Sequence, residues 1–218
     1  MRLHTLKKLL VVLIIAALAA AHTREMIADE TPLNFITRHG DQLLDGDRPF
    51  RFISFNIPNL MVQEDAYEFT SPNPWRWPDA FEIEDALESV RQQGGQVVRT
   101  YTISVFRDGS DMGETVHVRR PGKFNEEAFQ SLDRVLEVAR RKGIRVIIPL
   151  VDQWKWWGGV GEYAAFRGKR LEEFWNDPQL IEDFTATVKY VLTRKNTLTG
   201  VEYRNDPAVF GWETGNEI

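Results

Sequence analysis

Apolar residues follow two different spacings along this chain, and the two spacings alternate. Short, almost unbroken apolar runs predict four strands, at residues 49–56, 96–101, 144–151 and 208–213. In the intervals between them apolar residues recur every three or four positions and predict one helix each, over residues 83–90, 129–139 and 181–191. Strands that alternate with helices and are apolar along most of their length are typical of an α/β fold built on a parallel sheet.

Glycine, proline and capping residues mark where the predicted helices begin and end. Gly94-Gly95 ends the first helix, Asn125 is the expected N-cap of the second, and Asn176-Asp177-Pro178 opens the third. Arg140-Arg141-Lys142-Gly143 closes the second helix with positive charge and a C-terminal glycine. Ahead of the first strand, residues 35–44 predict a small hairpin.

Two architectures suit this pattern, the doubly wound open sheet and the closed (β/α)8 TIM barrel. No strand is followed by a G-x-G-x-x-G or Walker-type loop, so nothing favours a nucleotide-binding open sheet. Polar residues capable of chemistry instead follow the ends of successive strands: Asn56, Arg99 with Tyr101, Asp152 with Trp154, and Asn216-Glu217. Because a (β/α)8 barrel keeps its active site at the carboxyl ends of its strands, we expect the barrel.

The chain is short for a complete barrel. A barrel takes about 250 residues and eight strands, whereas this chain has 218 residues and four predicted strands. Long loops at 57–78, 105–124 and 155–175 use much of that length. We therefore expect a barrel truncated after its fourth strand. A complete half-size domain is the alternative, although it would expose sheet edges and apolar faces.

The amino terminus has the three parts of an export signal. Residues 1–8 are basic, residues 9–18 form an unbroken apolar run, and Ala19-Ala20-Ala21 offers small residues for cleavage. The apolar run is shorter than the roughly 18 residues of a spanning helix, and an uncleaved membrane anchor is the alternative. We predict a secreted protein, extracellular or periplasmic, without stable membrane association after cleavage. Its segments would be a signal peptide (1–21), a linker (22–34) and the N-terminal half of a catalytic barrel domain (35–218).

Composition and charge narrow the expected partners. Hydrophobic residues make up 43% of the chain, enough for a core, and there is no cysteine, so no disulfide holds the fold together. The formal charge of −5 becomes more negative without residues 1–21, because that segment holds Arg2, Lys7 and Lys8 and no acid. This charge argues against nucleic acid as a partner. The strand ends carry no group of histidines or cysteines, so we expect no metal and no other cofactor.

Several strand ends carry motifs that occur together in one known family. Arg99 ends the second strand, and the fourth ends in Trp212-Glu213-Thr214-Gly215-Asn216-Glu217. From about residue 35 onward, these motifs make the chain resemble glycoside hydrolase family 5, the cellulase-type family of retaining barrel enzymes. Asp152-Gln153-Trp154 with Gly158-Gly159, and the segment 196–201 (Asn-Thr-Leu-Thr-Gly-Val), are similar to its β-mannanase branch. That branch usually carries Asn-Asn-Trp where this chain has Asp152-Gln153-Trp154.

The resemblance implies a retaining hydrolase of O-glycosidic bonds in a β-linked polysaccharide, similar to mannan endo-1,4-β-mannosidases. It implies that Glu217 is the acid/base, that Asn216 bonds the 2-hydroxyl of the reacting sugar, and that Arg99 lies beside the nucleophile. The nucleophile would be a glutamate ending a seventh strand, which this sequence does not contain, so the 218-residue chain alone is expected to be inactive. A truncated or degenerate carbohydrate-binding protein without catalysis, and a β-glucanase of the same family, are the alternatives.

Tryptophans gather in two groups, at residues 75–77 and 154–157. Their flat faces suit the C–H faces of sugar rings, so aromatic residues at a polar strand end favour a carbohydrate cleft. The expected substrate-binding residues are Trp154, Trp156, Asp152, Tyr101 and Asn56, with Trp75 and Trp77 as candidates for outer subsites. Core packing is the alternative for the tryptophans, and it is the expectation for Trp157, Trp175 and Trp212.

Alternation along the fourth strand tests the orientation of Glu217. If Glu217 points into the barrel mouth, Glu213 shares its face, together with Gly211 and Gly215. Phe210, Trp212 and Thr214 would then face the helices. A carboxylate at position 213 inside the barrel needs a cation, and Arg99 is the available partner. A purely structural ion pair for Arg99 and ordinary solvation for Glu217 are the alternatives.

Overall fold

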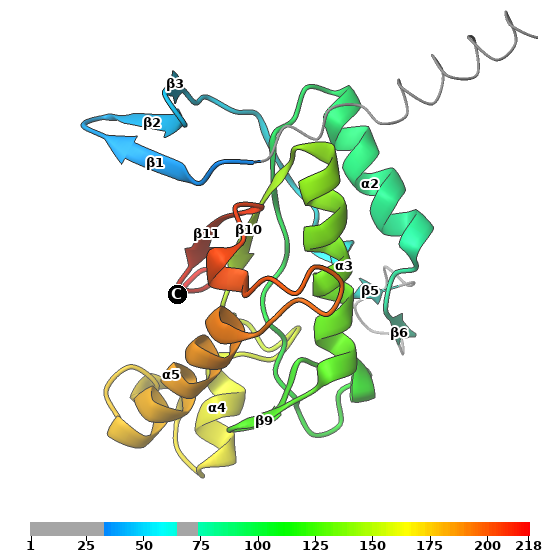
Figure 1. Ribbon diagram of the computed structural model, residues 1–218. Coiled ribbons are helices and arrows are strands. Elements are labelled where there is room, and N and C mark those ends of the chain that lie inside the picture. Colours follow the sequence, from blue (N-terminus) through cyan, green and yellow to red (C-terminus); the bar gives the residue numbers. More distant parts are fainter. Residues whose placement is uncertain (1–32, 65–73) are drawn as a thin grey trace, which may run out of the picture. The chain divides into compact units, whose positions relative to one another are not determined.

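Four parallel strands form the central sheet of the computed structural model, which describes residues 33–64 and 74–218 (Figure 1). In sheet order they are β11 (Val209–Glu213), β10 (Arg145–Pro149), β7 (Val97–Arg99) and β4 (Ser54–Asn56). Each neighbouring pair is parallel, with Asn56 opposite Arg99 and Arg99 opposite Ile147. The predicted α/β fold with a parallel sheet is therefore confirmed. Closure into a barrel stays a prediction, since β11 and β4 are the two edge strands.

A small antiparallel sheet precedes the central one, as the hairpin prediction requires. Its strands are β1 (Ile36–His39), β2 (Gln42–Asp45) and β3 (Arg48–Pro49), in that order. The buried Arg145 guanidinium donates to the Asp45 carboxylate and to the Asn34 carbonyl, both at 2.9 Å. These bonds explain a charged residue inside an otherwise apolar strand, because they tie the hairpin to the central sheet.

Four α-helices occur in the described part of the chain: α2 (Ala80–Gln92), α3 (Glu126–Lys142), α4 (Val160–Phe166) and α5 (Pro178–Thr193). Only α4 was not predicted, because seven residues inside a long loop show too little periodicity. Gly143 ends α3 in the left-handed conformation, with φ 69°, as the sequence predicts. Asn125 does occupy the N-cap position of α3, but its amide donates to the Val116 carbonyl at 3.0 Å instead of capping the helix.

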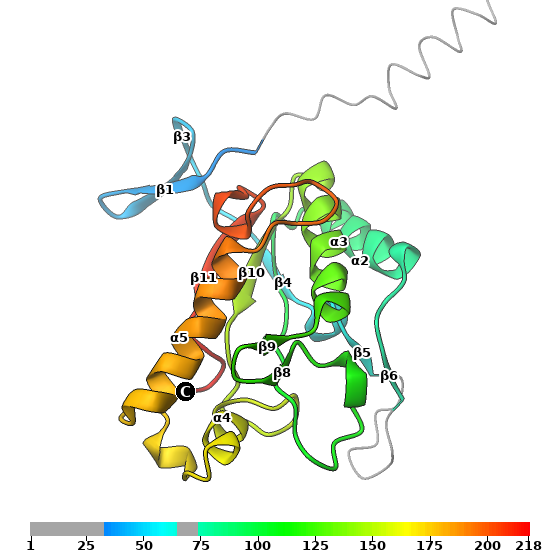
Figure 2. The ribbon, with the colours of Figure 1, turned by 60° about the horizontal axis from the view of Figure 1, so that its bottom comes forward.

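Short elements occupy the long loops between these helices and strands. They are η1 (Pro58–Leu60), β5 (Gln63–Glu64), β6 (Trp75–Arg76), η2 (Gly113–Thr115), β8 (Val118–Arg120), β9 (Lys123–Phe124), η3 (Leu171–Glu173) and η4 (Tyr203–Asn205). β5 pairs with β6 and β8 with β9, both antiparallel, while α2 and α3 run side by side (Figures 1 and 2).

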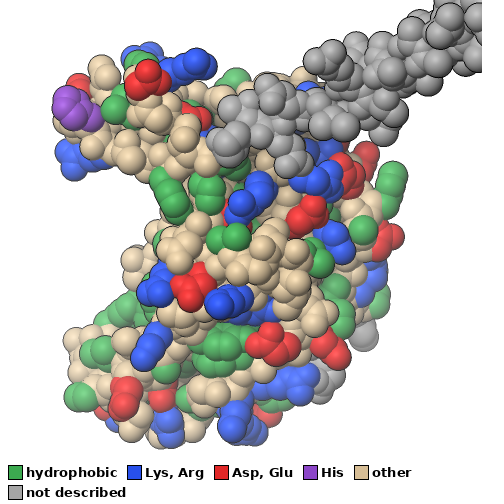
Figure 3. All heavy atoms as spheres, in the orientation of Figure 1, with side chains coloured by type: hydrophobic (Ala, Val, Ile, Leu, Met, Phe, Trp, Pro, Cys, Tyr) green, Lys and Arg blue, Asp and Glu red, His purple; other side chains and the backbone are tan. Residues whose placement is uncertain are grey.

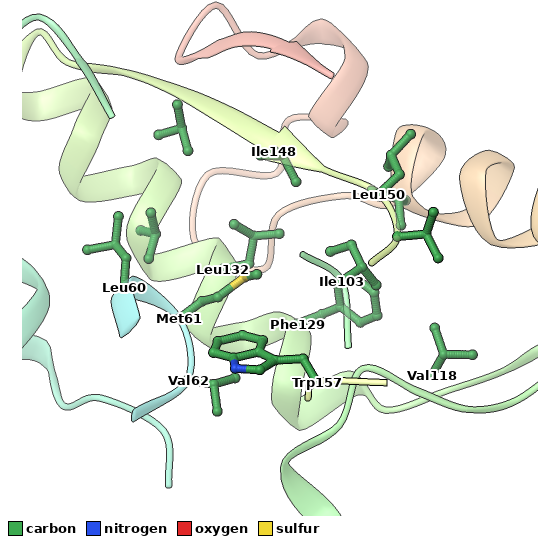
Figure 4. Packing of buried hydrophobic residues seen from close by; sticks show 14 of the residues in the cluster. Leu60, Met61, Val62, Ile103, Val118, Phe129, Leu132, Ile148, Leu150 and Trp157 are labelled. Carbon is green, nitrogen blue, oxygen red and sulfur yellow. The ribbon is translucent and has the colours of Figure 1, made fainter. Parts of the chain in front are cut away.

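The hydrophobic core joins α3 to the sheet. The predicted apolar face of α3 is fully buried: Phe129, Leu132, Leu136 and Ala139. Figure 4 shows Phe129 and Leu132 in one cluster with Ile148 of β10 and with Trp157. Trp157 is 2% exposed, so its expected core position is confirmed.

Two of the expected core or helix-facing aromatic residues lie elsewhere. Trp212 packs against the core as expected, but Trp175 is 44% exposed, because the neighbouring Phe174 takes the core position. Phe210 contacts Phe50 and Phe52, with ring centroids 6.2 and 5.0 Å away, whereas it was expected to face the helices. The pairing of β10 with β11 shifts register beside Phe210, and such an irregularity breaks the alternation of side chains.

The predicted signal peptide (1–21) and nearly all of the predicted linker (22–34) lie outside the described residues. Within residues 33–64 and 74–218, no helix has both the length and the apolar character needed to cross a membrane. Acidic, basic and hydrophobic side chains are intermixed on the face shown in Figure 3.

Candidate active site

Residues from three strands meet at the carboxyl edge of the central sheet. Arg99 is the last residue of β7, Asp152 follows β10, and Asn216 follows β11. A parallel bridge joins Asp152 to Asn216, with the Asn216 N–H donating to the Val151 carbonyl at 2.8 Å and the Gln153 N–H to the Asn216 carbonyl at 3.1 Å. The sheet therefore continues past the ends of β10 and β11, which fixes the backbone that carries the polar side chains.

An ion pair at this edge involves Arg99 and Glu213. Their closest nitrogen and oxygen atoms are 2.7 Å apart, and Arg99 Nη2 also donates to Asn216 Oδ1 at 3.1 Å. The pairing predicted from the alternation along the strand is confirmed. The half-buried guanidinium of Arg99 thus neutralises Glu213 and holds one side of the Asn216 amide.

Asp152 lies beneath this edge and is fully buried. Its Oδ1 accepts from Asn216 Nδ2 at 3.0 Å, and its Oδ2 accepts from the Tyr101 hydroxyl at 2.9 Å. Burial, and then the hydrogen bond to the Asp152 carboxylate, raise the pKa of Tyr101 well above its usual value. Tyr101 therefore stays a protonated donor at neutral pH. Both residues were expected to touch substrate. For Tyr101 that role stays a prediction, whereas Asp152 is buried with both oxygens bonded to protein donors, so direct contact with a substrate is not supported.

Glu217 lies beside the exposed Trp154. The indole N–H of Trp154, whose side chain is 58% exposed, donates to the Glu217 carboxylate. Glu217 is also the only non-glycine residue with positive φ in the described ranges, at 52°. Such a conformation is uncommon for a residue with a Cβ and occurs often at functional sites. The side chain is exposed, so its carboxyl group is open to a ligand.

A row of aromatic rings runs from Tyr101 toward the antiparallel pair β5 and β6. Tyr101 contacts Trp157 at 4.8 Å between ring centroids, Trp157 contacts Trp75 at 5.6 Å, and Trp75 contacts Trp156 at 6.1 Å. Trp156 Nε1 donates to a carboxylate oxygen of Glu64 at 3.0 Å. Burial raises the pKa of Glu64. An isolated acid in a long loop gives no sequence signal, so only the fold could connect Glu64 with Trp156.

Asn56 and Trp77 are not part of these contacts. Asn56 is exposed at the end of β4, opposite Arg99, and its side chain makes no hydrogen bond to the described residues. Trp77 lines a cavity of ≈ 320 Å³ together with residues of α2 and α3, including Ile83 and Ser131. Its expected place in an outer subsite is therefore not supported, because its ring belongs to the helix layer.

Gly158-Gly159 keeps the loop after β10 tight. A Cβ on Gly158 would lie 1.8 Å from the Val105 carbonyl oxygen, and one on Gly159 would lie 2.0 Å from the Asp152 carbonyl oxygen. That Asp152 oxygen accepts from the Val160 N–H at 2.9 Å. Only glycine allows this close approach, which places Trp157 in the core and fixes the backbone of Asp152.

These features can bind a polar ring compound and donate or accept a proton at Glu217. Across the two described ranges, no group of three or more histidine, aspartate or glutamate side chains is arranged to hold a metal ion. A family model described as GH family 5 beta-mannosidase-like matches residues 34–218. The chain belongs to glycoside hydrolase family 5.

Known members of the family resemble this chain over much of its length. The chain is 33% identical to mannan endo-1,4-beta-mannosidase 5 of Arabidopsis thaliana over 192 residues, which are 85% of this chain and 41% of that protein. It is 40% identical to mannan endo-1,4-beta-mannosidase 1 of Oryza sativa over 141 residues, 62% of this chain and 32% of the relative.

Solved structures give the same assignment. The endo-1,4-beta-mannanase from Rhizomucor miehei superposes with a TM-score of 0.71 at 26% identity, covering 85% of this chain and 49% of that one. The endo-beta-1,4-mannanase from Thermotoga petrophila superposes with a TM-score of 0.65 at 27% identity, covering 78% of this chain and 35% of that one. This family 5 chain thus spans about half the length of its relatives, or less.

Proposed function

We propose that this chain carries the acid/base side of a retaining hydrolase that cleaves a β-linked polysaccharide, with β-mannan as the preferred substrate. The observation that carries the proposal is the exposed carboxyl group of Glu217, next to Asn216 at the carboxyl edge of the sheet and in contact with Trp154. The preference for mannan rests on relatives named as mannan endo-1,4-beta-mannosidases.

In the proposed reaction Glu217 works twice. As an acid it protonates the oxygen of the leaving sugar, and as a base it later takes a proton from the attacking water. Its exposure lets the glycosidic oxygen reach it, and the indole N–H of Trp154 fixes its direction. Asn216, held by Arg99 on one side and by Asp152 on the other, lies beside the same sugar.

A double displacement also needs a second carboxyl group about 5–5.5 Å from the first, as nucleophile. At the described edge, Glu213 is bound by Arg99 and Asp152 is buried, so neither is free to attack a sugar carbon. We assign the nucleophile to the seventh strand of the expected (β/α)8 barrel, outside this sequence. The proposal also includes export by residues 1–21 and release from the membrane.

Trp154, together with Trp156 and Trp75 of the aromatic row, provides the binding surface in this proposal. Trp154 exposes most of its ring beside Glu217, and Trp156 is held by Glu64 next to Trp75. Sugar rings pack their C–H faces on such surfaces while their hydroxyl groups bond polar neighbours.

Binding of oligosaccharides to the 218-residue chain tests the proposal. We expect mannohexaose to quench tryptophan fluorescence and to bind more tightly than cellohexaose. Trp154→Ala should weaken binding, and Trp175→Ala, at an exposed tryptophan that contacts Phe174 and Phe184, should leave it unchanged. Tighter binding of cellohexaose would favour the β-glucanase alternative. Binding by this chain, combined with no hydrolysis by any longer form of the polypeptide, would favour a binding protein.

Retention is tested separately with a longer form of the polypeptide that hydrolyses mannan. NMR of the first product should show the β-anomer, because two displacements restore the starting configuration. The α-anomer as first product would contradict the assignment of Glu217 as an acid/base that serves both steps.

A further inference from the structure

Asp152 is the most enclosed acid at the carboxyl edge, and its surroundings point to a role beneath the substrate surface. Its side chain is fully buried, and each carboxylate oxygen accepts from a protein donor, Tyr101 on one side and Asn216 on the other. A buried carboxylate that is fully engaged in this way is not open to a sugar hydroxyl. Its effect on a bound sugar must therefore pass through Tyr101 or Asn216.

The chemistry of the carboxylate decides which way the Asn216 amide turns. An asparagine side chain has an oxygen that accepts and a nitrogen that donates, and the two ends have almost the same shape. An ionised carboxylate can only accept, so the nitrogen of Asn216 must face Asp152. The oxygen then faces Arg99, which can only donate and lies 3.1 Å away.

Tyr101 follows the same logic. Because the Tyr101 hydroxyl donates a hydrogen bond to Asp152, its oxygen can still accept one, and Asn216 Nδ2, which carries a second N–H, lies 3.4 Å from that oxygen. The contacts with Arg99, Asp152 and Tyr101 are thus all satisfied by the same orientation of the Asn216 amide, with its oxygen toward Arg99 and its nitrogen toward Asp152. An asparagine at position 152, as in the Asn-Asn-Trp of the mannanase branch, could donate or accept and would not impose that orientation.

We propose that Asp152 is a positioning residue that, together with Arg99, sets the orientation of the Asn216 amide and so decides which of its atoms face a sugar beside Glu217. The proposal rests on the proposed function for the sugar, but the orientation itself is a property of the free chain. Asp152 does not touch the sugar.

NMR of the side-chain amide of Asn216 tests the orientation in the 218-residue chain. The signal is assigned by its loss in Asn216→Ser. In the wild type we expect one pair of amide protons, protected from exchange with water. In Asp152→Asn the protection should fall about tenfold or more, since a hydrogen bond to a charged group is lost. Asp183→Asn, a buried aspartate of α5 bonded to Arg167, is the matched control and should leave the signal unchanged.

A second, independent test exchanges the donor and the acceptor of the contact between Asn216 and Asp152 and measures the melting temperature. Asn216→Asp alone puts two acceptors against each other, so it should lower the melting temperature at pH 7 and recover part of it on acidification, when one carboxyl group takes up a proton. The double variant Asp152→Asn/Asn216→Asp restores one donor and one acceptor at this contact and should regain most of the lost stability. The comparison of the double variant with Asn216→Asp also tests the positioning role of Asp152 if Asp152→Asn alone does not fold.

Two results would overturn the proposal: unchanged exchange of the Asn216 amide in a folded Asp152→Asn chain, or a double variant no more stable than Asn216→Asp. Binding of mannohexaose separates this proposal from the proposed function. If the wild type binds no saccharide while the exchange and stability results hold, the proposed function fails and the positioning role stands. If the wild type binds and Asp152→Asn binds equally well with unchanged exchange, only the positioning role fails.

Discussion

At the scale of single residues, the candidate site combines hydrogen-bonded, partly or fully buried polar side chains with one exposed carboxyl group, that of Glu217. Arg99, Asp152 and Asn216 form hydrogen bonds with one another, while Glu217 accepts a hydrogen bond from Trp154 and stays exposed. Fixed polar groups around one accessible carboxyl suit proton transfer, because the surroundings need little rearrangement when charge moves.

Replacing the proposed acid should affect substrates unequally. In a longer form that hydrolyses mannan, we expect Glu217→Gln to reduce turnover on the polysaccharide by about 10²–10⁴-fold, the usual contribution of general acid–base catalysis. Aryl glycosides with good leaving groups need no protonation, so their first step should lose much less. The measurement is kcat/KM on both substrate types, because this ratio reports the first step, with the exposed Glu172→Gln as control. Equal losses on both would show that Glu217 has a structural role.

At the scale of elements, buried polar networks hold the loops that carry the site. Asn196, in the motif similar to mannanases, caps its own turn through Leu198 N at 2.8 Å and donates to the Asp133 carbonyl of α3 at 2.9 Å. Arg194 and Tyr203 both bond the Asp133 carboxylate. The motif therefore serves to fasten the connection between α5 and β11 onto α3, which sets where β11 delivers Asn216.

The loop after β10 should not tolerate a side chain at its second glycine. Gly159→Ala places a Cβ against backbone, so we expect a loss of at least about 2 kcal/mol in the free energy of unfolding, measured by urea denaturation. Gly161→Ala is the matched control: its Cβ would have only an ordinary contact at 3.6 Å, to Leu171, and it lies within helix α4. That variant should be neutral or slightly stabilising, because alanine favours helix over glycine. Similar stabilities for both variants would contradict the close approach seen here.

The loop between β7 and α3 contains a buried histidine that should make stability depend on acid. His117 is fully buried, its Nδ1 bonds Ser104, and its ring lies against Phe129 of α3. Burial lowers the pKa of His117 to about 3, from an ordinary value of 6.5. The folded state thus binds this proton more weakly than the unfolded state does.

The neutral His117 contributes fully to the free energy of unfolding above pH 6.5. This contribution is lost as the pH falls from 6.5 toward 3, by up to about 1.4 kcal/mol per pH unit. We expect His117→Gln, which keeps a neutral polar side chain, to flatten the dependence of melting temperature on pH in this window. The exposed His39→Gln is the control and should keep the wild-type slope. An unchanged slope in His117→Gln would mean that other groups cause the acid sensitivity.

At the scale of the whole molecule, the chain has an open sheet and spans about half of its relatives or less. The parallel sheet has free edges at β4 and β11, and the chain covers 49% of the Rhizomucor miehei mannanase that it matches. In the proposed function this edge binds the saccharide, whereas a double displacement also requires a second carboxyl group.

We therefore expect the 218-residue chain to release no reducing sugar from mannan or glucan. The assay is reducing-sugar release over a day at several pH values, with a known family 5 mannanase as positive control. Release that is lost in Glu217→Gln would show that the sequence holds its own nucleophile, and would contradict the assignment of that group to a seventh strand.

The sequence by itself determined the order of the four central strands and of helices α2, α3 and α5, the parallel sheet and the family. Periodic apolar positions report which face of a helix or strand is buried, so the apolar face of α3 and the strand of Arg99 could be predicted. Strand ends in a parallel sheet meet at one edge, so the candidates Arg99, Asp152, Asn216 and Glu217 could be grouped without coordinates.

Tertiary structure alone decided which of these side chains touch one another and which face solvent. Glu64 and Trp156 are 92 residues apart, and no local pattern could join them. From its place after a strand, Asp152 was predicted to contact substrate. In the fold it is buried, and both of its carboxylate oxygens accept hydrogen bonds from protein donors. Trp175 and Phe210 depart from their expected environments because a neighbour fills the core or a register shift turns the strand. Burial, amide orientation and strand register depend on contacts between distant segments, which local periodicity does not record.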